Sequence, residues 1–119
     1  MGGFRELNVW KESKKLAVKI YQTTQKDAFR KDFGLRDQIR RAAVSIPSNI
    51  GEGDERGSNR EAVRFFYIAK GSLAELQTQL EIAYAIGYLN EEKLKELLDQ
   101  CATIGKMLGS LIKARTNDK

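Results

Sequence analysis

Polar side chains that could contact a partner recur at helical spacing between residues 35 and 56. Gln38, Ser45, Asn49 and Glu52 follow one another at steps of seven, four and three residues, which places them on one stripe of a helix. An apolar stripe runs beside them, so this helix can face a core without using these positions. The pattern favours a polar network that fixes helix register; the alternative is a cluster that contacts an anion or another protein.

Arginines surround this stripe and suggest a second kind of chemistry, the binding of phosphates. Six of them form the candidate nucleic-acid-binding set: Arg36, Arg40, Arg41, Arg56, Arg60 and Arg64. In a hairpin of two helices, the last three would cluster near the connecting turn, and Arg36 and Arg40 would lie toward the other end. An ordinary solvated surface is the competing interpretation, because a net charge of +5 is modest. Base stacking would need exposed aromatic rings, for which the candidates are Tyr67, Tyr84 and Tyr88.

Residues suited to catalysis or metal binding are sparse. The sequence has no histidine, so Glu75 and Glu81 lack the Glu-x-x-His partners of a di-iron bundle. The single cysteine, Cys101, lies on an apolar stripe and is interpreted as a core residue. The segment GEGDERG is glycine-rich but lacks the lysine and hydroxyl residue of a phosphate-binding loop. We therefore expect no enzyme, no cofactor, no metal site and no small-molecule substrate.

Length and composition indicate one folded domain over residues 1–119. No run of about 20 apolar residues predicts a membrane span, and the N-terminus lacks the apolar core of a signal peptide. One cysteine excludes an internal disulfide, so a cytoplasmic protein is expected. The positive charge is uneven: residues 1–60 hold 13 Lys or Arg and 8 Asp or Glu, whereas residues 61–119 hold 8 of each.

Apolar periodicity predicts four long helices, at about residues 9–26, 35–55, 59–86 and 91–114. Ser58 with Glu61 predicts a capping box before the third helix. Asn8 and Asn90 are the predicted N-caps of the first and fourth helices. Gly87 is expected to end the third helix in a left-handed conformation.

Three further features complete the predicted architecture. Pro47 falls inside the second helix, and because the apolar phase continues through it, we predict one kinked helix rather than two short ones. Phe29 and Phe33 are expected to tuck against the end of the bundle, and the tail from Arg115 is expected to fray. Four amphipathic helices with short connections predict an all-α, antiparallel up-down-up-down four-helix bundle.

Three pieces of the sequence carry a resemblance to a known family. They are QIRRAAVSIPSNI at residues 38–50, the pair Glu52-Gly53, and AKGSLAEL at residues 69–76. Together with the opening FRELNVWKES and the fourth helix, they resemble the 23S ribosomal RNA intervening-sequence proteins over nearly the whole chain. Gly51 departs from the alanine usual at this point of the motif, a change that could loosen the helix end.

The resemblance implies a four-helix bundle that assembles into a ring-like homopentamer and has no enzymatic activity. It also implies a link to accessory proteins of diversity-generating retroelements, whose expected partners are nucleic acid and a reverse transcriptase. The leading hypothesis is therefore a non-enzymatic oligomer that binds RNA or a nucleoprotein through basic residues of the second and third helices, with its charge multiplied around the ring. In this hypothesis the polar stripe orders subunit contacts or lines the ring. The alternative is a homo-oligomeric protein–protein scaffold with no nucleic-acid role.

Overall fold

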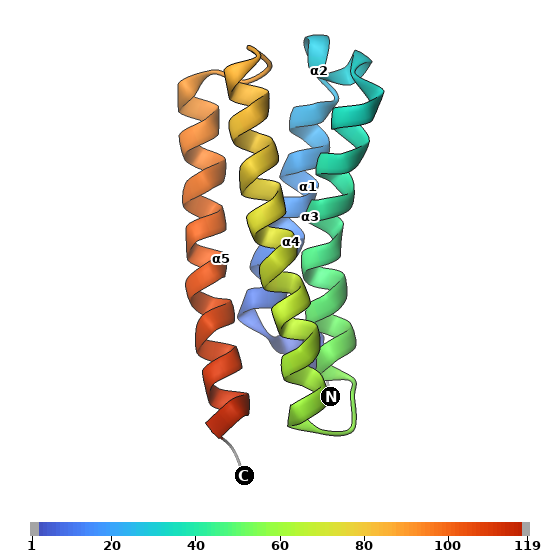
Figure 1. Ribbon diagram of the computed structural model, residues 1–119, viewed down its shortest axis with the longest axis vertical. Coiled ribbons are helices and arrows are strands. Elements are labelled where there is room, and N and C mark those ends of the chain that lie inside the picture. The colour runs from blue at the N-terminus through green and yellow to red at the C-terminus, as the bar shows by residue number, and fades with distance from the viewer. Residues whose placement is uncertain (1–2, 118–119) are drawn as a thin grey trace.

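The structure, a computed structural model, describes residues 3–117, and all of their regular secondary structure is helical (Figure 1). The fold consists of four long α-helices, with one short α-helix between the first two of them and a short 3-10 helix before the first. Their bounds are η1 Gly3–Glu6, α1 Asn8–Thr24, α2 Asp27–Lys31, α3 Phe33–Asp54, α4 Asn59–Ala85 and α5 Glu91–Asn117. No strand occurs among residues 3–117, so the predicted all-α class is confirmed.

The long helices lie side by side in a rod whose principal extents are 49 × 21 × 20 Å. Each long helix runs in the opposite direction to the one before it in Figure 1. α3 packs most extensively on α4, α1 lies against α3, and α4 lies against α5. The α1–α5 pair has the sparsest contact of the four neighbouring pairs, so this side of the rod is the most open.

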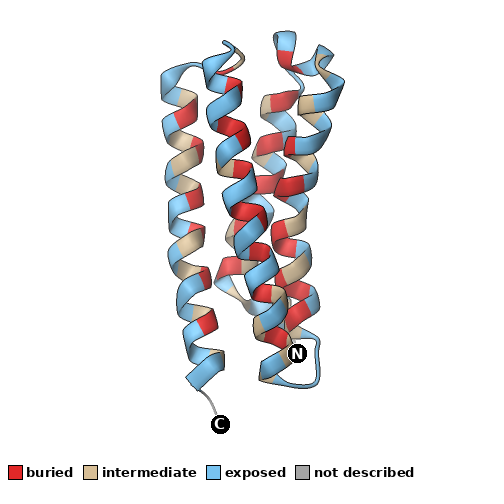
Figure 2. Cartoon of the chain, in the orientation of Figure 1, coloured by how far each residue is buried: buried red, intermediate tan, exposed pale blue. Residues whose placement is uncertain are grey.

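The core is formed by residues at three- and four-residue spacing that point inward from all four long helices, as the buried positions in Figure 2 show. Burial of these side chains is the main favourable term in folding such a bundle. The largest fully buried side chains are Phe29, Phe66, Leu16, Ile20, Ile39, Ile46, Ile50, Leu76, Leu80, Leu97, Ile104 and Leu108.

Three helix ends follow the signals in the sequence. Ser58 Oγ accepts the backbone N–H of Glu61 at 3.2 Å. Asn90 Oδ1 accepts that of Lys93 at 2.7 Å. Gly87 has the predicted left-handed conformation, with φ at +88°. The Gly87 and Asn90 predictions are confirmed, and so is the Ser58 half of the predicted capping box. Short side chains accept the free backbone N–H groups at these two helix starts.

The predicted N-cap at Asn8 is wrong. α1 begins at Asn8 itself, and Leu7 occupies the N-cap position without a side-chain hydrogen bond. The chain enters α1 through η1, where the Leu7 backbone N–H donates to Phe4 O at 3.0 Å. Leu7 also packs against the hydrophobic core, so apolar burial rather than a capping side chain fixes this start.

Pro47 lies within an unbroken α3, as predicted. Its ring is buried, and Ile46 and Ile50 on either side are fully buried. Since a proline removes one backbone hydrogen bond from the helix, burial of these neighbouring side chains offsets the loss.

Two predictions about the chain ends and connections are wrong. The tail was expected to fray from Arg115, but α5 continues to Asn117, and Arg115 Nη2 forms an ion pair of 2.6 Å with Asp54 Oδ1. Residues 118 and 119 of that tail lie outside the described residues. Phe29 is buried as expected, whereas Phe33 is 65% exposed. Asp32 caps α3 by accepting the Leu35 N–H at 3.1 Å, so Phe33 becomes the first helical residue and points away from the core.

Candidate nucleic-acid interface

The net positive charge of the chain is concentrated in α1, α2 and the turn between them. Residues 8–31 contain seven Lys or Arg and two Asp or Glu, a net charge of +5 that equals the charge of the whole chain. The rest of the sequence is therefore electrically balanced. Sequence reasoning placed the excess in the first half but assigned it to the arginines. The missed signal is the closely spaced lysine series in α1: Lys11, Lys14, Lys15 and Lys19.

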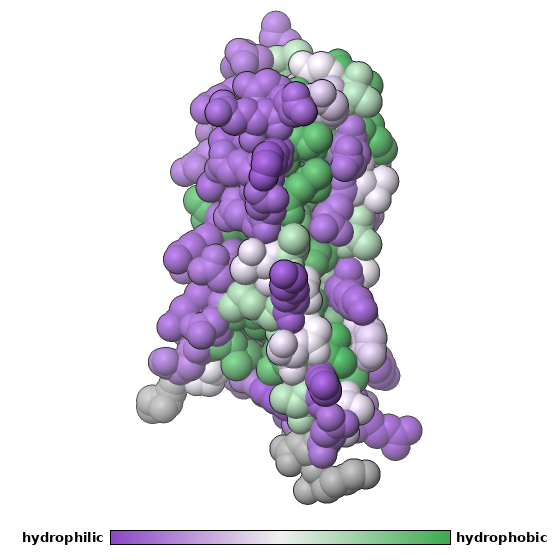
Figure 3. Space-filling view, turned by 90° about the vertical axis from the view of Figure 1, so that its left-hand side faces the viewer, coloured by the Kyte–Doolittle hydropathy of each residue, from purple (hydrophilic) through white to green (hydrophobic). Residues whose placement is uncertain are grey.

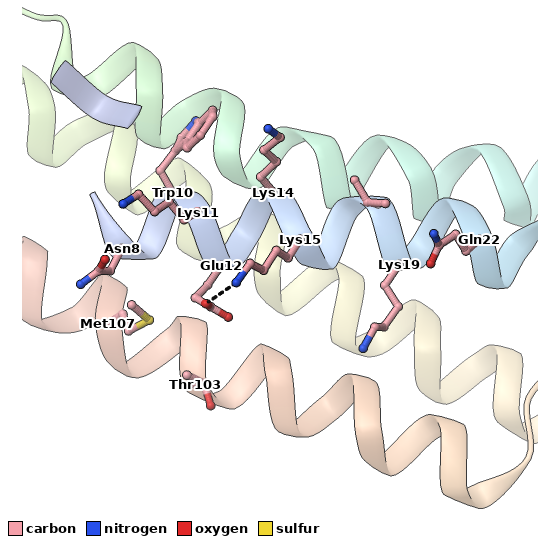
Figure 4. Close-up of a pocket in the computed structure, with 11 residues that line it drawn as sticks. Asn8, Trp10, Lys11, Glu12, Lys14, Lys15, Lys19, Gln22, Thr103 and Met107 are labelled. Carbon is pink, nitrogen blue, oxygen red and sulfur yellow. Dashed lines mark ion pairs between the residues drawn. The ribbon is translucent and has the colours of Figure 1, made fainter. Parts of the chain in front are cut away.

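These lysines border a groove of about 800 Å³ between α1 and α5. In Figure 4, Lys19 extends from α1 toward α5, which contributes Thr103 and Met107, whereas Lys15 Nζ forms an ion pair of 3.5 Å with Glu12 of α1. Lys19 Nζ is held by Glu96 Oε2 of α5 at 2.7 Å. Figure 3 views the side of the molecule on which α5 lies, where hydrophilic side chains cover much of the surface around a hydrophobic strip.

Arg36 and Arg40 extend this basic region onto α3. Arg40 Nε donates to Thr24 Oγ1 of α1 at 2.8 Å, and its guanidinium lies 4.5 Å from the Tyr21 ring centroid. Arg36 Nη1 donates to the carbonyl oxygen of Arg30 at 3.1 Å. Both arginines therefore lean toward α1 and α2 rather than toward α4. We call the resulting surface the basic face, composed of Lys11, Lys14, Lys15, Lys19, Arg36 and Arg40.

The other four predicted arginines do not join the basic face. Arg41 is exposed on the opposite side of α3, in a hollow that it shares with Glu75 of α4. Arg56 lies beyond the far end of α3, a helix of 22 residues that is about 33 Å long. It forms a 2.9 Å ion pair with Glu52, whereas Arg60 and Arg64 are exposed at the start of α4. The six arginines thus fall into three separate places.

The predicted polar stripe is also divided. Asn49 Nδ2 donates to the backbone oxygen of Ser45 at 2.8 Å and to its Oγ at 2.9 Å. The two hydroxyl groups of Ser45 and Ser72 lie 2.8 Å apart, so the network links α3 to α4. Gln38 and Glu52 are exposed and lie outside it. Ser72 is the member that sequence reasoning did not include, although it stands in the AKGSLAEL motif.

Comparison with known proteins identifies the family. The family model described as 23S rRNA-intervening sequence protein matches residues 5–110. The chain belongs to this family. The predicted resemblance is confirmed.

This member of the 23S rRNA-intervening sequence protein family is also similar to a solved structure. The crystal structure of a protein of unknown function from the S23 ribosomal protein family of Bacteroides thetaiotaomicron superimposes with a TM-score of 0.82 at 27% sequence identity. The match covers 88% of this chain and 95% of the other. No curated protein matches the chain.

Of the three tyrosines predicted as stacking candidates in this family member, Tyr88 has a packing role. Its hydroxyl donates to Asp32 Oδ2 at 3.0 Å, and its ring lies 5.2 Å from that of Phe29. The hydrogen bond to the Asp32 carboxylate raises the pKa of Tyr88, because it stabilises the protonated phenol. Tyr67 and Tyr84 are exposed on α4, away from the basic face.

Cys101 lies in the core, as its position on an apolar stripe predicts. Cys101 is fully buried, and desolvation raises the pKa of its thiol to about 12, so the thiolate is strongly disfavoured. Between residues 3 and 117, no group of three His, Cys, Asp or Glu side chains is placed to hold a metal ion. Within the same range, no helix is long and apolar enough to cross a membrane.

Proposed function

We propose that this family member is a non-enzymatic, homo-oligomeric protein that binds RNA or a nucleoprotein through its basic face. One observation carries the proposal: the entire net charge of +5 lies in residues 8–31, beside Arg36 and Arg40. Phosphate groups of a nucleic acid are attracted to such a surface, and binding releases their condensed counterions. The family name refers to ribosomal RNA and is consistent with this partner.

Oligomer formation would strengthen the attraction, because each subunit would contribute another basic face. The family resemblance favours a pentamer. Ile68, Ile82 and Ile86 support subunit contact through α4, since they share one side of this helix and are each about half exposed. The buried carboxamide oxygen of Gln79 on the same helix has no hydrogen-bond partner among the described residues, and a neighbouring subunit could supply one.

The test of RNA binding is fluorescence anisotropy of a labelled, structured RNA, titrated with protein over a series of salt concentrations. The expected result is tight binding with a linear fall of log affinity against log salt. The charge reversals Lys11→Glu/Lys14→Glu and Arg36→Glu/Arg40→Glu should each weaken binding at least about tenfold and flatten the salt dependence. Helix content and oligomeric mass should not change.

A matched control is Lys106→Glu/Lys113→Glu, which makes the same change of charge at two exposed positions of α5. These lysines lie outside the basic face, so their reversal should weaken binding much less. Equal losses from the control and the basic-face variants would refute the assignment of the site.

A protein scaffold without a nucleic-acid role is the second candidate, favoured by the exposed isoleucines of α4. Its expected signature is a protein partner that remains bound after nuclease treatment and is released by Ile82→Lys. Absence of RNA binding even at low salt would favour this candidate over the first.

A further inference from the structure

Two exposed aromatic rings stand at the α2 end of the basic face, each beside an arginine. Phe33 is 65% exposed, the largest exposed fraction among the large hydrophobic residues described. The guanidinium of Arg36 lies 4.7 Å from its ring centroid. Tyr21 is 40% exposed, and the guanidinium of Arg40 lies 4.5 Å from its ring centroid. Each ring therefore presents apolar area to solvent next to a fixed positive charge.

The two aromatic–arginine pairs are neighbours in space. Arg36 and Arg40 are four residues apart on α3, which is one helical turn and a rise of about 6 Å. Both reach toward the segment that joins α1 to α3, since Arg40 binds Thr24 and Arg36 binds the Arg30 carbonyl. We call this row the aromatic–arginine ladder: Tyr21, Arg40, Arg36 and Phe33. It lies at the end of the rod where α2 is labelled in Figure 1.

The arginines of the ladder are held in place rather than free to rotate. Arg40 has a hydrogen bond of 2.8 Å, and Arg36 has two, to the Arg30 carbonyl at 3.1 Å and to Asp37 Oδ1 at 3.0 Å. A guanidinium fixed in this way loses little conformational entropy when a ligand binds. Its plane, like an aromatic ring, can then receive a flat partner.

The nucleotides of unpaired RNA fit this arrangement, because each has a flat base next to a negatively charged phosphate. Unpaired bases stack on aromatic rings and on arginine planes, whereas a duplex conceals the faces of its bases. An isolated exposed phenylalanine needs no explanation, but here two rings and two ordered guanidiniums form one row at the edge of a polycationic surface. We propose that the aromatic–arginine ladder binds the bases of single-stranded RNA, while the lysines of α1 bind the adjoining phosphates. The inference rests on the proposed function and specifies which form of RNA is bound.

The test compares two labelled probes, a 12-nucleotide single-stranded RNA of mixed sequence and the duplex of the same strand. The variant Phe33→Leu/Tyr21→Leu removes both rings and retains every charge. Stacking contributes about 1–3 kcal/mol per base, so two rings should account for about 30-fold or more in affinity for the single strand. The variant should leave duplex affinity and the salt dependence unchanged, because neither depends on the rings.

The matched control is Tyr67→Leu/Tyr84→Leu, which removes two exposed rings from α4. It should bind the single strand like the parent protein. Phe33→Leu alone provides a second variant, because so exposed a side chain contributes little to folding. Helix content and thermal stability of every variant are measured alongside binding.

The outcomes separate the two proposals. If neither probe binds, the proposed function fails and the ladder has no role in RNA binding. If both probes bind equally and the ladder variant binds as the parent does, the basic face still binds RNA but the ladder does not recognise unpaired bases. An equal loss in the control variant would also overturn the role of the ladder.

Discussion

The ring of Phe4 packs against Gly51 so closely that a Cβ on Gly51 would lie 3.3 Å from Phe4 Cδ1. Phe4 belongs to η1, and its ring lies 5.3 Å from that of Trp10. Gly51, where the resemblance implies an alanine, thus makes room for an N-terminal aromatic residue. The sequence-based expectation was a looser helix end, but Gly51 is buried within a continuous α3.

Gly51→Ala should change the free energy of unfolding by less than about 0.5 kcal/mol. Alanine favours the helix by about 1 kcal/mol over glycine, and the tight contact with Phe4 offsets this gain. In a Phe4→Leu background the same substitution should stabilise the protein by about 0.5–1 kcal/mol. Urea denaturation of the four proteins in this double-mutant cycle measures the coupling. Additive effects would contradict the proposed contact between the two residues.

Gly53→Ala should destabilise the protein by about 1–3 kcal/mol, in contrast to Gly51→Ala. A Cβ at Gly53 would lie 2.9 Å from Phe65 Cβ and 3.0 Å from the backbone oxygen of Ala62, where α3 and α4 approach each other. Gly109→Ala is the matched control, since no atom outside the nearby backbone of its own helix lies within 4 Å of its Cβ position. The control substitution should stabilise the protein by about 0.5–1 kcal/mol. If Gly109→Ala instead destabilised the protein, helix propensity would not explain the effects of these substitutions.

Arg115→Met should lower the free energy of unfolding by about 1–3 kcal/mol, because it leaves the Asp54 carboxylate poorly solvated. The side chain of Asp54 is 15% exposed and that of Arg115 is 23% exposed, so their ion pair is partly shielded from water. Lys95→Met, which breaks the well-exposed pair with Asp99, should cost less than about 0.5 kcal/mol. Chemical denaturation distinguishes the two. Equal costs would mean that Arg115 does not anchor the end of α5.

Glu96 should titrate below its ordinary pKa of 4.5, because Lys19 Nζ, and secondarily Lys93, donates hydrogen bonds to its carboxylate. Carboxyl-detected NMR titration measures this pKa directly, and Lys19→Met should move it upward toward 4.5. A lowered pKa in the folded state means that ionised Glu96 stabilises the fold above pH 4.5 and that this contribution is lost as the pH falls through the lowered pKa. The stability difference between the parent and Glu96→Gln should therefore shrink in acid. In Lys106→Met the Glu96 pKa should not move, and a similar shift there would rule out a local effect.

The sequence predicted the helical elements well because their determinants are local. Apolar spacing located the four long helices to within a few residues, and Ser58, Gly87 and Asn90 marked helix ends through bonds that span only a few residues. The failures have two causes. At Asn8 and Phe33 the local signals were misassigned, because η1 precedes α1 and Asp32 caps α3. Arg115 depends on an ion pair with the distant Asp54, a contact that no local pattern encodes.

The candidate site could be predicted only in part from the sequence. The sequence shows that residues 8–31 are rich in lysine, but the six arginines form the more regular series and therefore predicted a different site. Helical spacing gives the direction in which each side chain leaves its own helix. It does not show which neighbouring helix lies in that direction. Arg40 and Arg41 are adjacent in sequence, but the structure turns one toward Tyr21 and the other toward Glu75.

The sequence by itself determined an all-helical chain of the 23S rRNA-intervening sequence protein family, with a net charge of +5 and no histidine. These properties follow from composition and short-range periodicity. Only the tertiary structure decided that the charge of α1 and α2 joins Arg36 and Arg40 on one face, that Phe33 remains exposed beside them, and that Arg56 lies at the other end of the rod. The physical reason is that a surface is formed by residues from different helices, whose relative positions are fixed by packing of the shared core.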